Sequence, residues 1–322
     1  MVSSKPLVSV IMAVRNGEKS LKKTLSALLR QTYTNIEIVI VNDASTDKTS
    51  VILEEFVKKD SRVKVITNKE RLERCVSRNI AIEGSKGKYI AVNDADDISC
   101  PHRIETEVKY LESNPDVYLV GGRANILDEK GEKIGTSWGK RTPVDITERL
   151  IEGNVLVHSS IMFRNKKEFF YREKFLRAQD YDLYLQVVGS GHLVHLLPNI
   201  LVEYMSKKDI LYDDYLIDQL VYSYTIQNLC KEKLREGKDM YEDIDREYMY
   251  DIYPQDDLDF LYFLQLYTQG DFKEARKKIV KIMGVYGFNI KRFLYLIDTY
   301  FKGRLISSAK YLKRGILNSF TL

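Results

Sequence analysis

Three aspartates stand within four residues of the sequence, in the stretch Asn93-Asp94-Ala95-Asp96-Asp97. They follow Tyr89-Ile90-Ala91-Val92, a short apolar run that is typical of a buried strand. Carboxylates this close repel one another and cannot all be buried without partners. Hard divalent cations such as Mg²⁺ take oxygen ligands, usually one or two carboxylates together with substrate phosphates. The stretch therefore indicates either a cation site or a solvated acidic turn.

Polar clusters also follow two earlier predicted strands. The apolar run 7–14 ends at Arg15-Asn16-Gly17, and the run 36–41 ends at Asn42-Asp43. Segments with apolar residues at helical spacing separate these runs, and this alternation predicts a mostly parallel sheet. In open sheets of this kind, ligands bind beyond the carboxyl ends of the strands. Three polar clusters at one sheet edge therefore favour a binding site.

The rest of the chain falls into a mixed part and a helical part. After the acidic stretch, the pattern predicts helices over 101–113, 146–151 and 181–188, strands over 117–121, 155–163 and 194–204, and a hairpin over 124–138. From residue 210 it predicts only helices, over 210–235, 258–268, 272–285, 290–302 and 305–318. We therefore predict an α/β domain over residues 1–207 and a helical region over 208–322, basic from about residue 271.

Composition is that of a soluble globular protein, with 44% hydrophobic and 30% charged residues in a chain of 322. The cysteines Cys75, Cys100 and Cys230 are odd in number and far apart. This spacing matches neither a disulfide framework nor a metal site, so we expect a reducing compartment, the cytoplasm. No signal-peptide pattern opens the sequence, and no apolar stretch approaches the roughly 20 residues that span a bilayer.

Five segments together resemble the family 2 glycosyltransferases, whose catalytic domain has the GT-A fold. They occur in the family's order and spacing and lie within about residues 6–205. They read VSVIMAVRN over 8–16, IVNDASTD over 40–47, SRN over 77–79, GKYIAVNDADD over 87–97 and QDYDL over 179–183.

The resemblance implies transfer of a sugar from a nucleotide-diphosphate donor to an acceptor hydroxyl, with inversion and with Mg²⁺ or Mn²⁺ as cofactor. It implies donor-binding roles for Ala13, Val14, Arg15 and Asn16, which border the nucleotide, for Asp43 and Arg78 at the base, and for Asp94 at the nucleotide and sugar. It implies that Asp96 binds the metal and that Asp180 is the catalytic base. Inversion needs one base opposite the leaving group, and a helix N-terminus favours an ionised Asp180.

The sequence departs from the family pattern at several positions. Ala13 and Arg15 stand where the family often has proline and tyrosine, and Gln179 replaces the usual glutamate. The family's late histidine is missing after Tyr204. It is therefore open whether the protein supplies a third ligand to the metal. No Gln-x-x-Arg-Trp motif follows Asp180, which argues against a processive polysaccharide synthase.

Each candidate residue also has a structural interpretation. Asp43 and Asp180 could cap the helices that follow them, although capping does not exclude catalysis. Arg78 could lie on a helix surface. His158 could face the diphosphate or the acceptor, or it could be a hydrogen-bonded core histidine. We expect structural roles for His192 and His195, which alternate on a predicted strand.

The basic C-terminal region suggests a further partner. Residues 271–322 contain 12 basic and 3 acidic residues, a net charge of +9, whereas residues 1–270 have a net charge of −5. Basic residues interleaved with apolar ones suit a helix on an anionic membrane surface, or an ordinary bundle with a solvated basic face. The first interpretation places the protein peripherally on the inner membrane face, near a lipid-linked or glycan acceptor. We expect no nucleic-acid partner, because the body is acidic and no nucleic-acid motif is present.

Three other functions compete with sugar transfer. A sugar-phosphate nucleotidylyltransferase would need a glycine-rich phosphate loop after the first strand, where only Gly17 stands. A signalling receiver domain does not fit a match of about 200 residues. A nucleotide-sugar-binding protein without turnover is disfavoured because Asp43, Asp94, Asp96 and Asp180 are all present.

Overall fold

The computed structural model describes residues 5–137, 144–206, 214–268 and 270–287. By its internal contacts the chain divides into two units, and each has a hydrophobic cluster of its own. The first unit contains Met1–Ile151, Val155–Glu173 and Gln179–Lys208; the second contains Glu152–Asn154, Lys174–Ala178 and Asp209–Leu322. The domain boundary predicted near residue 207 lies outside the described residues.

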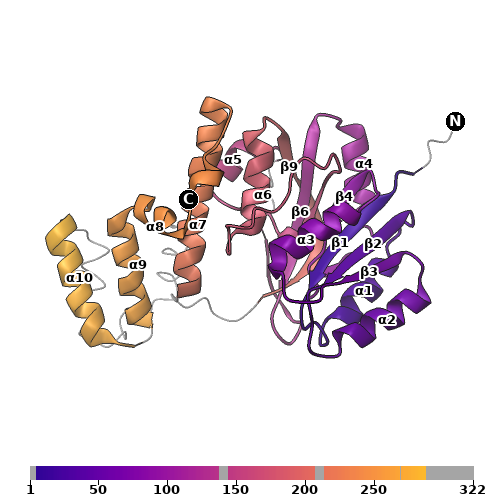
Figure 1. The fold of residues 1–322 in the computed structure, drawn as a ribbon, viewed down its shortest axis with the longest axis horizontal. Coiled ribbons are helices and arrows are strands. Elements are labelled where there is room, and N and C mark those ends of the chain that lie inside the picture. The colour runs from indigo at the N-terminus through magenta and orange to yellow at the C-terminus, as the bar shows by residue number, and fades with distance from the viewer. Residues whose placement is uncertain (1–4, 138–143, 207–213, 269, 288–322) are drawn as a thin grey trace. The chain divides into compact units, whose positions relative to one another are not determined.

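A nine-stranded mixed sheet forms the centre of the first unit (Figure 1). Its strands are β1 (Val8–Val14), β2 (Ile36–Asn42), β3 (Val63–Thr67), β4 (Tyr89–Val92), β5 (Ile98–Ser99), β6 (Val117–Leu127), β7 (Lys133–Thr136), β8 (Ile161–Arg164) and β9 (Leu193–Met205). They lie in the order β3-β2-β1-β4-β8-β6-β9-β5, and β7 pairs with β6. The first four strands pair in parallel, as does β6 with β9, whereas β8 is antiparallel to both of its neighbours.

Helices cover both faces of the parallel part of this sheet. The α-helices up to residue 189 are α1 (Leu21–Leu29), α2 (Thr49–Lys59), α3 (Glu73–Gly84), α4 (Arg103–Ser113), α5 (Thr147–Glu152) and α6 (Gln179–Gly189). The apolar sides of α1, α2 and α4 join one core cluster with alternate residues of β1 and β2. In contrast, α3 contacts β1 and β2 from the opposite face, where Gly84 lies beside Val39 and Ile66.

One predicted strand is in part a turn. The sequence predicts a strand over 155–163, but His158–Ser160 forms a 3₁₀ turn, η1, and β8 begins only at Ile161. Ser160 donates hydrogen bonds to the carbonyl of Val157 from both its backbone N and its Oγ, at 2.8 and 2.7 Å. Side chains of this kind compete with the strand ladder for backbone partners, and apolar periodicity does not report that competition.

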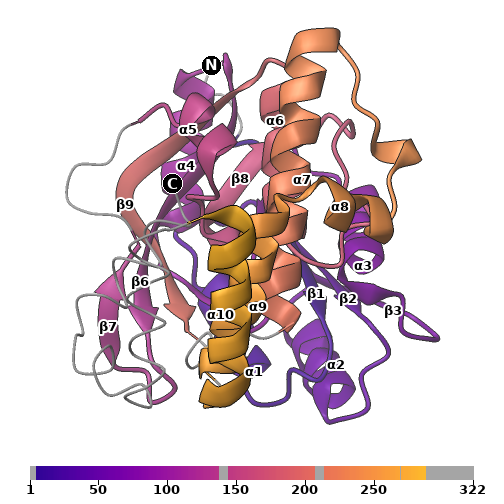
Figure 2. The ribbon, with the colours of Figure 1, turned by 90° about the vertical axis from the view of Figure 1, so that its left-hand side faces the viewer.

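The described part of the second unit is helical. It contains α7 (Asp214–Glu236), α8 (Arg246–Ile252), α9 (Gln255–Thr268) and α10 (Phe272–Tyr286), of which α8 was not predicted. Figure 1 shows α9 and α10 side by side, and in Figure 2 α10 lies in front of α9. Their apolar faces form one buried cluster. The helices predicted over 290–302 and 305–318 lie outside the described residues. Among the helices that the structure describes, none is both long and apolar enough to cross a membrane.

Candidate active site

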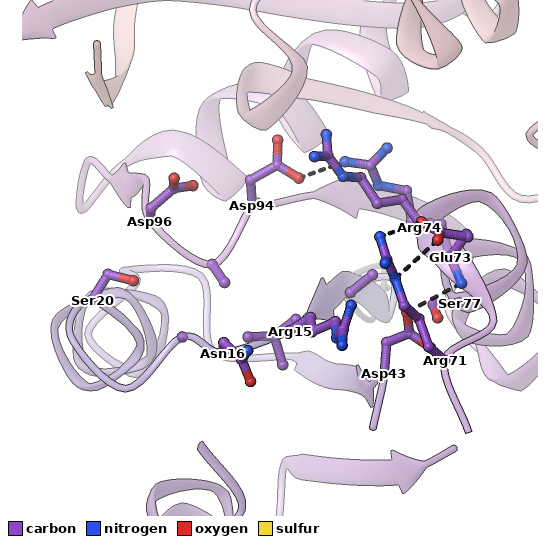
Figure 3. Close-up of a pocket in the computed structure, with 15 residues that line it drawn as sticks. Arg15, Asn16, Ser20, Asp43, Arg71, Glu73, Arg74, Ser77, Asp94 and Asp96 are labelled. Carbon is purple, nitrogen blue, oxygen red and sulfur yellow. Dashed lines mark hydrogen bonds and ion pairs between the residues drawn. The ribbon is translucent and has the colours of Figure 1, made fainter. Parts of the chain in front are cut away.

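A cavity of about 470 Å³ opens at the carboxyl ends of β1, β2 and β4, and we call it the strand-end cavity (Figure 3). These strands are neighbours in the sheet, so their ends meet at one edge. Its lining includes every residue to which the resemblance gives a donor or metal role: Ala13, Val14, Arg15, Asn16, Asp43, Arg78, Asp94 and Asp96. The lining also contains Gly17, Ser20, Arg71, Glu73, Arg74, Ser77 and Ala95. Asp180 does not line the cavity.

Hydrogen bonds join the loop after β1 to the loop after β2. The backbone N of Asn16 donates to Ser45 Oγ at 3.0 Å, and its Oδ1 accepts from the backbone N of Thr46 at 2.9 Å. Asn16 has a left-handed backbone with φ of 54°, which asparagine tolerates better than most residues. The next residue must be small, because a Cβ at Gly17 would lie 2.7 Å from Val14 Cγ2. This cavity wall is therefore formed before any ligand binds.

Asp43 is buried and holds the start of α3. Its carboxylate accepts hydrogen bonds from Asn68 Nδ2 at 2.9 Å and from the backbone N atoms of Leu72 and Glu73 at 2.8 and 3.1 Å. It does not cap α2, because the backbone N of Thr49 donates to Asp47 instead. The helix-capping alternative for the helix that follows Asp43 in the chain is therefore wrong.

Arg78 belongs to a buried polar cluster behind the cavity. Its Nη2 donates to Asp94 Oδ1 at 2.8 Å, and its guanidinium lies 5.2 Å from the ring centroid of Tyr171. His158 bonds Asp94 Oδ2 through Nδ1 and Tyr171 Oη through Nε2, both at 2.9 Å. Arg78 is only 9% exposed, so the helix-surface alternative is wrong. His158 is also 9% exposed and has the bonding of a core histidine.

The charges of this cluster reinforce one another. Burial alone would raise the pKa of the Asp94 carboxyl, but its interactions with His158 and Arg78 outweigh burial and hold the pKa well below its usual range. Burial opposes the charge of Arg78 in the same way, and Asp94 reverses that effect, so the pKa of Arg78 is raised. Asp94 is therefore an ionised carboxylate in a fixed orientation at the cavity wall.

The other two aspartates of the acidic stretch have different surroundings. Asp96 is half-buried and lines the cavity, whereas Asp97 is buried and faces the protein. Asp97 accepts hydrogen bonds from Ser159 Oγ and from the backbone N of Met205. Burial, followed by the negative charges of Asp94 and Asp96, raises the pKa of Asp97 to about 7. Asp97 therefore anchors the loop, while Asp94 and Asp96 face the cavity.

A buried arginine anchors both ends of the acidic loop by hydrogen bonds. Arg103, in the first turn of α4, donates to Asn93 Oδ1 at 3.1 Å and to Ser99 Oγ at 2.9 Å. It also donates to the carbonyls of Val92 and Ile161, at 2.8 and 3.0 Å. These bonds tie the ends of β4 and β5 and the start of β8 to one side chain, so the loop between β4 and β5 is held at both ends.

Asp180 lies outside the cavity lining, on a different element from the acidic loop. It stands in the first turn of α6 and is half-buried. Burial raises the pKa of Tyr204 to about 12, and the charges of Asp97, Asp96, Asp94 and Asp180 add to the effect. The charges of Asp180 and of the acidic stretch therefore act on the pKa of the same tyrosine.

The acidic stretch fits a divalent ion that is bound partly by its substrate. Among the described residues, no group of three or more His, Cys, Asp or Glu side chains is placed to hold a metal on its own. Mg²⁺ in transferase sites typically uses one or two carboxylates, waters and substrate phosphates, so a complete protein cage is not required. Asp94 and Asp96 both line the cavity, and Asp94 is also bonded to Arg78 and His158.

Other histidines have structural contacts. His195 Nδ1 lies 2.8 Å from Tyr110 Oη, and the ring of His192 stacks on Tyr118 with centroids 4.6 Å apart. The cavity residues that sequence reasoning missed are Ser20, Arg71, Glu73, Arg74 and Ser77. The available signal was the close spacing of three arginines in the sequence, at positions 71, 74 and 78.

Solved structures share this fold. The mannosyltransferase PcManGT from Pyrobaculum calidifontis, solved with GDP-Man and Mn²⁺, aligns with a TM-score of 0.62 and 17% sequence identity. The alignment covers 99% of this chain and 86% of that one. The fold is the GT-A fold that the sequence motifs predict, with a helical C-terminal region.

Sequence comparison identifies the family. The model for glycosyl transferase family 2 matches residues 9–174, just over half of the chain. An uncharacterized glycosyltransferase of Methanocaldococcus jannaschii is 34% identical over 71% of this chain and 81% of that protein. The UDP-Glc:α-D-GlcNAc-diphosphoundecaprenol β-1,3-glucosyltransferase WfgD of Escherichia coli is 34% identical over 36% of this chain and 45% of its own. The chain belongs to glycosyl transferase family 2 and is a glycosyltransferase.

Proposed function

We propose that this glycosyltransferase is inverting and metal-dependent, and that its donor is a nucleotide-diphosphate sugar bound in the strand-end cavity. The observation that carries the proposal is the convergence of Asp43, Arg78, Asp94 and Asp96 on that cavity. They come from the ends of two strands, β2 and β4, and from one helix, α3, so their meeting depends on the fold and not on proximity in the sequence.

The acidic end of the cavity would take the diphosphate. Asp96 would hold Mg²⁺ or Mn²⁺ there, and the bound ion would supply Lewis-acid stabilisation of the charge on the leaving group. Asp94 would contact the donor from an orientation that Arg78 and His158 fix. The solved structure of PcManGT with GDP-Man and Mn²⁺ supports this assignment through the shared fold.

Asp180 would be the catalytic base. It would take the proton of the acceptor hydroxyl as that oxygen bonds to the anomeric carbon, and the bond from that carbon to the diphosphate oxygen would break. The nucleoside diphosphate leaves with the electron pair. Asp180 stands in the first turn of α6, and carboxylates suit both proton removal and the positive character of an oxocarbenium-like transition state.

The names of the relatives support a class of acceptor. WfgD, by its name, transfers glucose to a sugar on diphosphoundecaprenol. We extend this to the present protein as a lipid-linked or cell-surface glycan acceptor, which suits a location at the inner membrane face.

Two substitutions separate donor binding from transfer. Asp96→Ala should abolish the metal-dependent part of nucleotide-sugar binding, measured by calorimetry with UDP-, GDP- and dTDP-sugars in Mg²⁺ or Mn²⁺. Asp180→Asn should leave donor binding nearly unchanged and lower nucleoside diphosphate release in the presence of acceptor by about 100-fold or more, the usual contribution of a general base. Asp116→Asn, at an exposed position outside the cavity, is the matched control.

Each result has an opposite that would contradict the assignment. Transfer by Asp180→Asn at the normal rate would show that another group is the base. If Mg²⁺ or Mn²⁺ strengthens donor binding by Asp96→Ala as much as it does for wild type, Asp96 is not the metal ligand. Retention of configuration in the product would exclude a single base acting opposite the leaving group.

A further inference from the structure

Arg71 and Glu73 form a two-point ion pair in the lining of the strand-end cavity. Arg71 Nη2 donates to Glu73 Oε2 at 3.0 Å, and Arg71 Nε lies 2.9 Å from Glu73 Oε1. Both side chains are 54% exposed, so a ligand in the cavity can reach their polar atoms. Figure 3 shows this pair beside Asp43, with Asp96 and Ser20 at the other side of the cavity.

Glu73 keeps a backbone conformation that favours glycine. Its φ is 69°, in the left-handed region that side chains with a Cβ rarely adopt. Strained residues of this kind cluster at binding sites, because the surrounding structure holds them in place. A glycine at position 73 would fit the backbone without strain, so a glutamate there points to a role for its side chain.

Asp43 rigidly positions this pair. The backbone N atoms of Leu72 and Glu73 both donate to its carboxylate, at 2.8 and 3.1 Å, and Asn68 donates a third bond at 2.9 Å. The short segment that carries Arg71 and Glu73 is therefore fastened to the end of β2. Asp43 has three of its acceptor positions occupied by the protein, which leaves little of its carboxylate for a ligand.

We propose that Arg71 and Glu73 contact the nucleoside of the donor and determine which nucleotide the protein accepts, with Asp43 as their positioning residue. This rests on the proposed function, which places the diphosphate at the acidic end of the cavity and leaves the opposite end for the nucleoside. The pair has no net charge, so it suits an uncharged base better than a phosphate. Arg71 supplies donors and Glu73 acceptors, which together match a base edge that presents both.

Calorimetry on the full-length protein with UDP, GDP, dTDP and ADP, in Mg²⁺ or Mn²⁺, tests the proposal. Arg71→Ala should weaken binding of the preferred nucleotide by about 5- to 100-fold, the range for an arginine that reads a base edge, and should reduce the preference among the four. Glu73→Gly should weaken the preference similarly, while its unfolding midpoint stays within a few degrees of wild type, because glycine relieves the backbone. Lys69→Ala and Glu70→Ala remove the same charges from the same segment outside the cavity lining, and should bind as wild type.

The outcomes separate this inference from the function on which it rests. If wild type discriminates among the nucleotides and Arg71→Ala keeps the same preference, the inference is wrong and the proposed function stands. A uniform loss for all four nucleotides would assign Arg71 to the phosphates and likewise overturn it. If wild type binds none of the four, both proposals fail.

Discussion

Arg103 and Glu107 form an ion pair in which neither side chain is exposed to solvent. Arg103 Nε lies 3.2 Å from Glu107 Oε2, one turn along α4. Within the described residues, neither carboxylate oxygen of Glu107 accepts a hydrogen bond by the usual geometry. Burial raises the pKa of Glu107 to about 7, although the charge of Arg103 opposes the shift. The residue that anchors the acidic loop therefore has a counter-ion whose charge depends on pH.

This pKa predicts how stability changes with pH. A carboxyl whose folded pKa lies above its unfolded value of 4.5 contributes stability that is full below about pH 4.5 and is lost as pH rises through about 7. Glu107→Gln cannot ionise, so its free energy of unfolding relative to wild type should rise by about 2–3 kcal/mol between pH 4.5 and 8. Urea unfolding at several pH values measures the difference. An unchanged difference over this range would show that Glu107 does not titrate there.

At the scale of elements, side-chain hydrogen bonds join the start of β1 to the segment just before β4. Gly87 N donates to Ser9 Oγ at 2.8 Å, and Ser9 Oγ donates to Glu37 Oε1 at 2.6 Å. Lys86 N donates to the same Glu37 oxygen at 2.6 Å. The segment before β4 therefore passes so close to β1 that a Cβ at Gly87 would lie 2.5 Å from Ser9 N and 2.8 Å from the Leu7 carbonyl oxygen.

Two glycines three residues apart should respond oppositely to alanine. Gly87→Ala should lower the free energy of unfolding by about 2–3 kcal/mol, because the methyl group meets backbone atoms that cannot move independently. Gly84→Ala, in α3, meets only Val39 and Ile66 side chains at 3.6 and 3.7 Å and should raise it by about 0.5–1 kcal/mol. Chemical unfolding measures the free energy of unfolding of each variant relative to wild type. A Gly87→Ala protein as stable as wild type would contradict the close approach.

The polar clusters at the strand ends were predictable from two patterns in the sequence, the continuous apolar runs of the strands and the helical spacing between them. Continuous apolar runs marked β1, β2 and β4, and intervening helices required parallel pairing, so Asn16, Asp43 and Asp94 had to share an edge. What the sequence cannot supply is the pairing of side chains across elements. His158 is 64 residues from Asp94, and nothing in its neighbourhood indicates that contact.

Arg71 and Glu73 illustrate the same limit within one loop. Their position depends on hydrogen bonds from residues 72 and 73 to Asp43, which lies 29 and 30 residues earlier. A sequence pattern shows a helix start with charged residues, which is ordinary for an exposed surface. Only the backbone conformation of Glu73 and the carboxylate of Asp43 distinguish this segment from other exposed helix starts.

At the scale of the whole molecule, charge is unevenly distributed along the chain. Residues 271–322 have a net charge of +9, and the described part of this region is α10. Its buried residues Ala275, Ile279 and Ile282 pack with α9, whereas Val280 and Val285 are exposed as isolated apolar side chains. Lys273, Lys277 and Lys281 are exposed. We therefore propose electrostatic attraction to an anionic surface, not insertion of this helix, as its contribution to membrane binding.

Neutralising these lysines tests the attraction. The triple substitution of Lys273, Lys277 and Lys281 by glutamine should weaken sedimentation with phosphatidylserine-containing vesicles by roughly 100-fold, at about 1 kcal/mol per lysine. Raising the salt concentration should weaken wild-type binding in the same direction. The control is the same triple change at Lys23, Lys58 and Lys59, which are exposed on α1 and α2. Equal losses in both triple variants, or no wild-type binding, would remove α10 as the contact.

The strand order also determines when the cavity can exist during synthesis. All of its lining residues have been made by residue 96, but the acidic loop is held by His158, Ser159 and Met205. The bond from Met205 to Asp97 spans 108 residues, and contacts so distant in sequence form late in folding. A nascent chain that ends before β9 carries every lining residue but lacks the bond from Met205 that anchors Asp97. Nucleotide binding by a growing chain would therefore report that the entire sheet has assembled.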